Sequence, residues 1–144
     1  MYKFNQIGLC VADADAAERF FVQGLGFERR MTAFIGEAYG KLLALGPNMS
    51  VEVHILSKDG FTLELLHMKS PRPTSAGATA MNTLGFTHMS LIVEDLDVGI
   101  ERLCAHGGTV LAHTRLRDEH GEYVFCTGPA GIRVELAHFF GSKS

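Results

Sequence analysis

The fold is decided by a stretch that occurs twice in the chain: FNQIGLCVAD at residues 4–13 and FTHMSLIVED at residues 86–95. A second motif also repeats, as GFTLELLH at residues 60–67 and GIRVELAH at residues 131–138. Paired motifs of this kind indicate two copies of one structural module. The first pair aligns Gln6 with His88, and the second aligns Glu64 with Glu135. The repeat thus places four metal-capable side chains at equivalent points on the first and last strands of two modules.

Periodicity predicts the same order of elements, β-α-β-β-β, in each half. Strands are expected at residues 3–11, 27–35, 51–56 and 61–67 of the first half, with a helix capped by Asp13 or Asp15 and a short extra helix at 37–45. In the second half we expect strands at 86–94, 109–113, 122–127 and 132–139, and a helix at 96–106. The fold class is therefore α+β, with a first module at 1–67, a linker at 68–84 and a second module at 85–144.

Composition and charge are those of an ordinary globular protein, with 47% apolar residues, 20% charged residues and a net charge of −3. Such a small negative charge gives no reason to expect nucleic acid or an anionic membrane as a partner. No apolar run approaches the roughly 20 residues of a membrane span, and the N-terminus lacks a signal-peptide pattern. Cys10, Cys104 and Cys126 are odd in number and widely spaced, which favours reduced thiols in a cytoplasmic protein.

The alternation of side chains along each strand puts all four candidates on the less apolar face. Gln6 lies opposite Ile7 and Leu9, and Glu135 lies opposite Val134 and Leu136. Glu64 and His88 follow the same alternation on the other two strands. The apolar faces can pack under the helices, which leaves the four polar side chains together on the other side. Burying a carboxylate without a compensating partner costs several kcal/mol of free energy. Two Glu at equivalent positions therefore favour a bound cation.

From Phe4 to Phe139 the chain resembles the vicinal oxygen chelate superfamily. The matching motifs are QIGLCVAD (6–13), GF (26–27), LEL (63–65), GFTH (85–88) and GPAGIRVEL (128–136). The resemblance implies that the modules form a cup-shaped, mostly antiparallel sheet with a divalent metal on its floor. It assigns the metal to Gln6, Glu64, His88 and Glu135, an order that resembles glyoxalase I in particular. The extradiol dioxygenases of the superfamily have His where this chain has Gln6.

One imidazole and three oxygen donors suit a divalent ion such as Zn, Ni, Co or Mn. The function expected is that of a metal-dependent lyase or isomerase of the glyoxalase type. Such an enzyme abstracts the proton alpha to a carbonyl of a small, vicinally oxygenated substrate. By resemblance Glu135 is the base, and Glu64 is a ligand or partner base. The related methylmalonyl-CoA epimerases use the same proton chemistry and form an alternative.

The resemblance to glutathione-dependent glyoxalases implies polar anchors at three positions where this chain has Cys10, Met68 and Leu84. Their absence favours a smaller or more apolar substrate. The side chains predicted to line the pocket are Phe4, Cys10, Leu66, Phe86 and Ile92. Arg133 shares the face of Glu135, where it either binds a substrate carboxylate or pairs with a nearby acid.

Each candidate also has a structural alternative. Gln6 can face a wet cavity, His88 can be a core histidine, and the two Glu can be exposed on a sheet rim. His54 and His113 have no partner that the sequence identifies, and His67 and His138 are expected at the surface. A metal-free binding protein of the bleomycin-resistance type is the rival from another class. In either case the expected partner is a small molecule, and the expected assembly is a homodimer.

Overall fold

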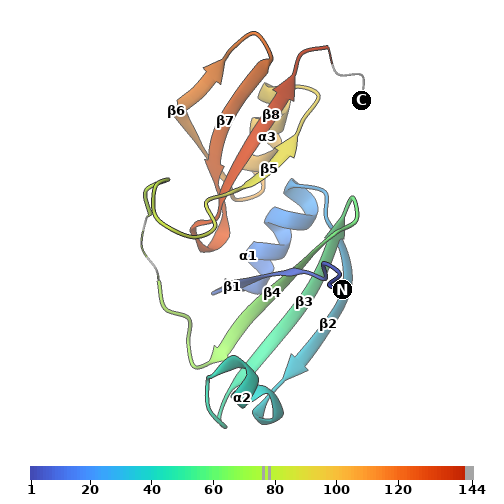
Figure 1. The fold of residues 1–144 in the computed structure, drawn as a ribbon, viewed down its shortest axis with the longest axis vertical. Helices are drawn as coiled ribbons and strands as arrows, with labels where there is room; N and C mark the ends of the chain where they lie inside the picture. Colours follow the sequence, from blue (N-terminus) through green and yellow to red (C-terminus); the bar gives the residue numbers. More distant parts are fainter. Residues whose placement is uncertain (76, 78, 142–144) are drawn as a thin grey trace. The chain divides into compact units, whose positions relative to one another are not determined.

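The computed structural model describes residues 1–75, 77 and 79–141, and it divides into two compact units, Met1–Ser75 and Ala76–Ser144. Ala76 and Ala78 of the predicted linker, and residues 142–144 of the predicted second module, lie outside the described residues. Each unit contains one four-stranded mixed sheet and follows the order β-α-β-β-β (Figure 1). The predicted α+β class with tandem modules is confirmed. The predicted module boundaries stay a prediction.

The first unit begins with β1 (Ile7–Val11), the helix α1 (Ala14–Glu18) and a π-helical continuation, η1 (Arg19–Gly24). Then follow β2 (Glu28–Ile35), the short helical turns η2 (Glu37–Tyr39) and α2 (Gly40–Leu43), β3 (Ser50–Lys58) and β4 (Phe61–Ser70). The sheet order is β1-β4-β3-β2, with β1 parallel to β4 and the other neighbours antiparallel. Asp59 and Gly60 both have positive φ, as a two-residue hairpin turn between β3 and β4 requires.

The second unit repeats this arrangement. It consists of β5 (Met89–Ile92), α3 (Leu96–Ala105), β6 (Thr109–Arg117), β7 (Gly121–Thr127), the turn η3 (Pro129–Gly131) and β8 (Arg133–Phe139). The order β5-β8-β7-β6 matches that of the first sheet, and β5 is again the strand that pairs in parallel. Among the described residues, no helix combines the length and apolar character needed to cross a bilayer.

The helices of both units start at equivalent aspartates. Asp13 accepts a hydrogen bond from the Ala16 backbone N–H, and Asp95 accepts one from that of Val98, each at 3.0 Å. These are N-caps that satisfy an otherwise unpaired backbone donor. The helices then cover the apolar sheet faces predicted by parity. The fully buried side chains include Phe20, Phe21, Leu63 and Leu65 in the first unit and Leu103, Val134 and Leu136 in the second.

Several predicted boundaries were wrong by a few residues. The strands expected from residue 3 and residue 86 begin at Ile7 and Met89, where the parallel ladders with β4 and β8 start. Gln6 and His88 therefore lie one residue before their strands. The strand expected at 109–113 continues to Arg117, with an irregular register between Leu111 and Leu116. Such an irregularity disturbs the alternation on which the prediction depended.

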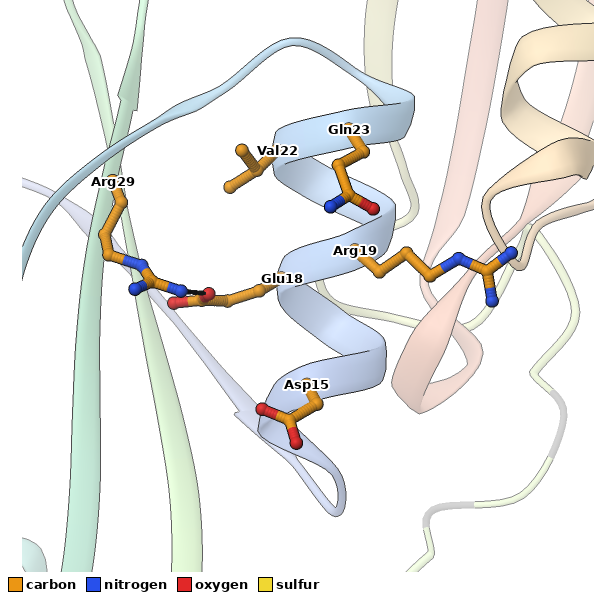
Figure 2. A pocket seen from close by; sticks show the side chains of 6 residues that line it. All are labelled: Asp15, Glu18, Arg19, Val22, Gln23 and Arg29. Atoms are coloured by element: carbon orange, nitrogen blue, oxygen red, sulfur yellow. Dashed lines mark hydrogen bonds and ion pairs between the residues drawn. The ribbon is translucent and has the colours of Figure 1, made fainter.

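A charged cluster joins α1 to the helix side of the first sheet. Glu18 pairs with Arg29 of β2 (Figure 2). It also lies 2.6 Å from Nδ1 of His54. The Nε2 of His54 lies 2.6 Å from Glu52, whose other oxygen is 3.3 Å from Nζ of Lys69. Both ring nitrogens of His54 thus lie within hydrogen-bond distance of carboxylates. The cluster fixes the helix on the sheet through charge-assisted hydrogen bonds.

We expect Glu52→Gln to lower the free energy of unfolding at pH 7 by about 1–2 kcal/mol, the usual worth of such a bond. The hydrogen bond from His54, with Lys69 nearby, holds the pKa of Glu52 below its ordinary value of 4.5. A carboxyl group whose pKa is lower in the folded than in the unfolded protein stabilises the fold at a pH above its unfolded-state pKa. This stabilisation is lost as the pH falls through its folded-state pKa. The variant should therefore lose part of the pH dependence below about pH 4.5.

Urea unfolding of the wild type and the variant between pH 3 and pH 7 measures this effect. Glu28→Gln serves as the matched control, because Glu28 is exposed and forms a surface ion pair with the exposed Arg30. Equal pH slopes for the wild type and Glu52→Gln would contradict the assignment.

Candidate functional site

Glu64 lies on the face of the first sheet that carries Gly8, and Gln6 directly precedes β1. In the parallel ladder Gly8 is opposite Glu64, and a Cβ added to Gly8 would lie 3.7 Å from Oε2 of Glu64. Gln6 is two residues before Gly8 and shares its parity. The missing side chain at Gly8 leaves open space above the carboxylate. Both Gln6 and Glu64 are half-buried.

His88 and Glu135 occupy the corresponding face of the second sheet. Ser90 is opposite Glu135 in the ladder of β5 and β8, and its hydroxyl donates to Oε1 of Glu135 at 2.7 Å. His88 lies two residues before Ser90 on the same side. Ser90 thus occupies the position that Gly8 has in the first module. Its hydroxyl binds Oε1 of Glu135 and leaves Oε2 accessible to a ligand.

The imidazole of His88 is oriented by two neighbours. Its Nδ1 lies 2.9 Å from the hydroxyl of Thr87, and its ring meets that of Phe125 edge-on at a centroid distance of 5.1 Å. Phe125 is the antiparallel partner of Glu135 on β7. If Nδ1–H donates to Thr87, Nε2 keeps the lone pair that a metal would take. The exposed position of His88 leaves that nitrogen accessible.

The two pairs lie on the sheet faces opposite the helices. In the first unit, α1 reaches His54, which is opposite Leu65 on the other side of β4 from Glu64. In the second, a Cβ on Gly99 of α3 would contact Leu136, the neighbour of Glu135. The carboxylates of the pairs are therefore separated from the helix-side cores, and solvent reaches them.

Among the described residues, Glu64 has no hydrogen-bond or ion-pair partner, so nothing in its own unit compensates its charge. Apolar side chains surround it on the same face. Val51 and Val53 are buried there, and Ile35, Ile55, Leu66 and Met68 pack against them. A half-buried carboxylate in such surroundings favours a cation or a hydrogen-bond donor from outside the unit.

The other residues predicted to line the pocket differ in their burial and in their neighbours. Leu66 belongs to the apolar group around Val53, and Cys10 is exposed on the face of Glu64. Phe86 and Ile92 are 97% and 73% exposed. Phe4 precedes β1 and stacks on Phe61 at 6.1 Å, which brings its ring to an aromatic group that includes Phe27.

Arg133 contacts backbone carbonyls. Its Nη2 donates to the carbonyl of Thr79 at 2.7 Å, and Nη1 reaches the carbonyl of Thr87 at 3.4 Å and the sulfur of Met81 at 2.7 Å. Neither of the two roles expected for it, a substrate contact or an ion pair with an acid, accounts for these bonds.

Within either unit, the described residues bring together no group of three or more His, Cys, Asp or Glu side chains that could hold a metal. The donors of each pair are those expected of a divalent metal site, an amide oxygen with a carboxylate in one and an imidazole with a carboxylate in the other.

Sequence reasoning missed three groups of residues. Ser90 could have been found by parity, because it lies two residues after His88. Phe125 could not, since its place beside His88 depends on the pairing of β7 with β8. The Glu18–His54–Glu52 cluster also required the tertiary structure, because its members are distant in sequence and belong to α1 and β3.

The concave regions detected in the first unit lie away from Glu64. One, of about 380 Å³, is lined by Asp15, Glu18, Arg19, Val22, Gln23 and Arg29, on the helix side (Figure 2). Another, of about 430 Å³, surrounds the β3–β4 turn and reaches Thr62, two residues before Glu64. The helix-side cavity carries balanced charges, with Glu18 and Arg29 already paired.

Comparison with known proteins agrees with this architecture. Residues 3–136 match the Glyoxalase/Bleomycin resistance protein/Dioxygenase superfamily, and the chain belongs to this family. A glyoxalase family protein from Bacillus cereus is 25% identical, with a TM-score of 0.84 over 98% of this chain and 96% of that one. No protein of curated function matches the sequence.

Two more distant structures share the fold. The trypanothione-dependent glyoxalase I of Leishmania major is 16% identical, with a TM-score of 0.66 over 96% of this chain and 87% of that one. An antibiotic-binding protein from Streptomyces sp. CB03234 is also 16% identical, with a TM-score of 0.61 over 96% and 97% of the two chains. At this identity the likeness shows the fold alone, and it includes both a catalyst and a binding protein.

We expect the three thiols to differ in reactivity. Cys10 and Cys104 are exposed, whereas Cys126 is buried and burial raises its pKa to about 11. Iodoacetamide should therefore label Cys10 and Cys104 in the native protein and Cys126 only after unfolding. Partial desolvation also raises the pKa of the Cys10 thiol above 9.0, so its labelling rate should still increase above pH 9.

Peptide mass spectrometry at several times and pH values measures these rates. Loss of labelling in the Cys10→Ser variant identifies the signal that belongs to Cys10. Equal labelling of all three thiols in the folded protein would contradict the buried position of Cys126.

Proposed function

We propose that this protein is a metal-dependent lyase or isomerase of the glyoxalase type, in which Gln6, Glu64, His88 and Glu135 hold one divalent ion. One observation carries the proposal. In each unit, the candidate Glu lies on the sheet face away from the helix, and the other candidate directly precedes the strand that pairs with it in parallel. The unpartnered carboxylate of Glu64 supports it, because a cation would supply the missing charge.

The donor set favours Zn, Ni, Co or Mn. One imidazole nitrogen, one amide oxygen and two carboxylates give a net ligand charge that leaves a divalent ion electrophilic. When bound, the ion would supply positive charge next to the oxygen on which negative charge develops.

Glu135 is the proposed base. The hydroxyl of Ser90 donates to Oε1, which orients the carboxylate and leaves Oε2 to take the proton alpha to the substrate carbonyl. Returning that proton to the neighbouring carbon isomerises the substrate, and returning it to the opposite face of the same carbon epimerises it. Glu64 is a ligand or partner base. The open space above Gly8 and the apolar side chains around Val53 favour a small substrate with an apolar part.

We also propose that the protein acts as a cytoplasmic homodimer on a small molecule. The three cysteines are unpaired, which fits a reducing compartment. Glutathione is not required by this proposal, because Cys10, Met68 and Leu84 stand where polar anchors would be needed.

A metal-free binding protein is the second candidate. It is favoured by the apolar group around Val51 and Val53, which shares the face of Glu64 and can contact an apolar or aromatic ligand. The two candidates differ in metal content and in the role of Glu135.

We expect near-stoichiometric metal in protein purified without chelator, and a sharp fall in His88→Ala, because this substitution removes the only nitrogen ligand of the proposed set. Elemental analysis measures the content, and thermal unfolding with added Zn, Ni, Co or Mn measures the stabilisation. His113→Ala is the matched control, since His113 is an exposed residue of β6. The absence of metal together with no stabilisation by any of the four ions would refute the enzyme proposal.

We expect Glu135→Gln to lower the turnover rate by about 10²-fold or more, because it removes the proton acceptor and keeps the shape. The assay follows phenylglyoxal and methylglyoxal, with and without glutathione, and an epimerisable 2-substituted acid. Glu122→Gln, on the helix side of β7, controls for loss of a carboxylate in the same sheet. A ligand that binds without turnover, and equally well to Glu135→Gln, would favour the metal-free binding protein.

A further inference from the structure

Arg133 bonds the segment that leads into β5. Its guanidinium donates to the carbonyl of Thr79 and reaches Met81 and the carbonyl of Thr87, acceptors spread over the residues just before His88. The planar fork of Arg suits this task, because its several donors point in fixed directions and can bridge separate carbonyls. A Lys at the same place would offer only one nitrogen.

Arg133 and His88 lie at the start of the parallel ladder between β8 and β5. Met89 is opposite Val134, His88 and Arg133 directly precede this pair, and the guanidinium of Arg133 reaches the carbonyl of Thr87. Arg133 is also two residues before Glu135 and shares its face. It therefore lies next to both candidate ligands of the second unit.

Thr87 connects the guanidinium to the imidazole. Its carbonyl accepts from Arg133 at 3.4 Å, while its hydroxyl lies 2.9 Å from Nδ1 of His88. Holding Thr87 in place therefore orients the ring of His88. The repeat supports a special role, because the counterpart of Arg133 in the first module is Thr62, and β5 is the strand entered from the long connecting segment.

We propose that Arg133 is a positioning residue: it holds the segment 79–87 against β8 and thereby fixes the imidazole of His88 beside Glu135, with Nε2 free to bind. This proposal rests on the function proposed above, in which His88 is a metal ligand. In this proposal Arg133 orients His88 in the folded protein before any substrate binds.

The test compares Arg133→Met, Arg133→Lys and the control Arg117→Met, which removes the same charge from β6 at the other edge of the sheet. Amide hydrogen exchange of residues 79–88 measures whether the segment is held. Nitrogen-15 shifts of the His88 imidazole report its tautomer without metal, and titration with Co²⁺ alone measures affinity.

We expect Arg133→Met to speed exchange of residues 79–88, to mix the tautomers of His88 and to weaken Co²⁺ binding by about 10- to 100-fold, the usual effect of losing such a supporting contact. Arg133→Lys should fall between this variant and the wild type, and Arg117→Met should match the wild type. Unchanged exchange and an unchanged tautomer in Arg133→Met would overturn the proposal.

Thr87→Val provides a second measurement if Arg133→Met does not fold. It removes the hydroxyl that contacts His88 and keeps the carbonyl that accepts from Arg133, so it should alter the tautomer and leave exchange of residues 79–86 unchanged. A wild-type tautomer in Thr87→Val would count against the connection through Thr87. If the wild type binds no Co²⁺, the function proposed above fails, and exchange and tautomer alone decide the role of Arg133.

Discussion

The parallel pairing of the first and last strands of each module is the constraint on which the site depends. It places Gly8 opposite Glu64 and Ser90 opposite Glu135, although these residues are far apart in sequence. Paired residues in a ladder share a face, so Gly8 and Ser90 lie on the side of the carboxylates, and Gln6 and His88 precede them by two residues. A shift of either strand by one residue would move its candidate to the helix side and separate the pair. The buried side chains of the helix faces, such as Leu65 and Leu136, oppose that shift because it would expose them to water.

Glu52 and Glu64 lie on opposite faces of the first sheet and differ in whether they have an ion-pair partner within the part of the chain that the structure describes. On the helix side, Glu18, Glu52, His54 and the cations Arg29 and Lys69 compensate one another, and they hold α1 in place. On the opposite face, Glu64 stands among apolar side chains without a partner in the described part of its unit. Compensated charges stabilise a fold, whereas an uncompensated one has to obtain its partner from a ligand or from another part of the protein. This contrast distinguishes the structural carboxylates from the proposed functional one more clearly than exposure does.

The repeat and the alternation of apolar residues predicted the elements, their order and the sheet face of Glu64 and Glu135. They did not predict where β1 and β5 begin, because residues 4–6 and 86–88 alternate as a strand does but have no neighbour in the ladder. They also assigned His54 no partner, since Glu18 approaches it only when α1 packs on β3. Arg133 was considered for substrate or acid, and its contacts with Thr79 and Thr87 depend on the path of the connecting segment. Each of these misses concerns a contact between elements that are distant in sequence.

By itself, therefore, the sequence determined the tandem β-α-β-β-β modules, the family and the identity of the four candidate ligands, because these follow from local periodicity and from motifs that occur twice. Only the tertiary structure decided which residues support them: Ser90 on Glu135, Thr87 and Phe125 around His88, and open space above Glu64 at Gly8. The physical reason is that side-chain alternation is a property of one strand, whereas hydrogen bonds and ring contacts require the register between strands. That register is set by burial of the whole helix face, which no short motif encodes.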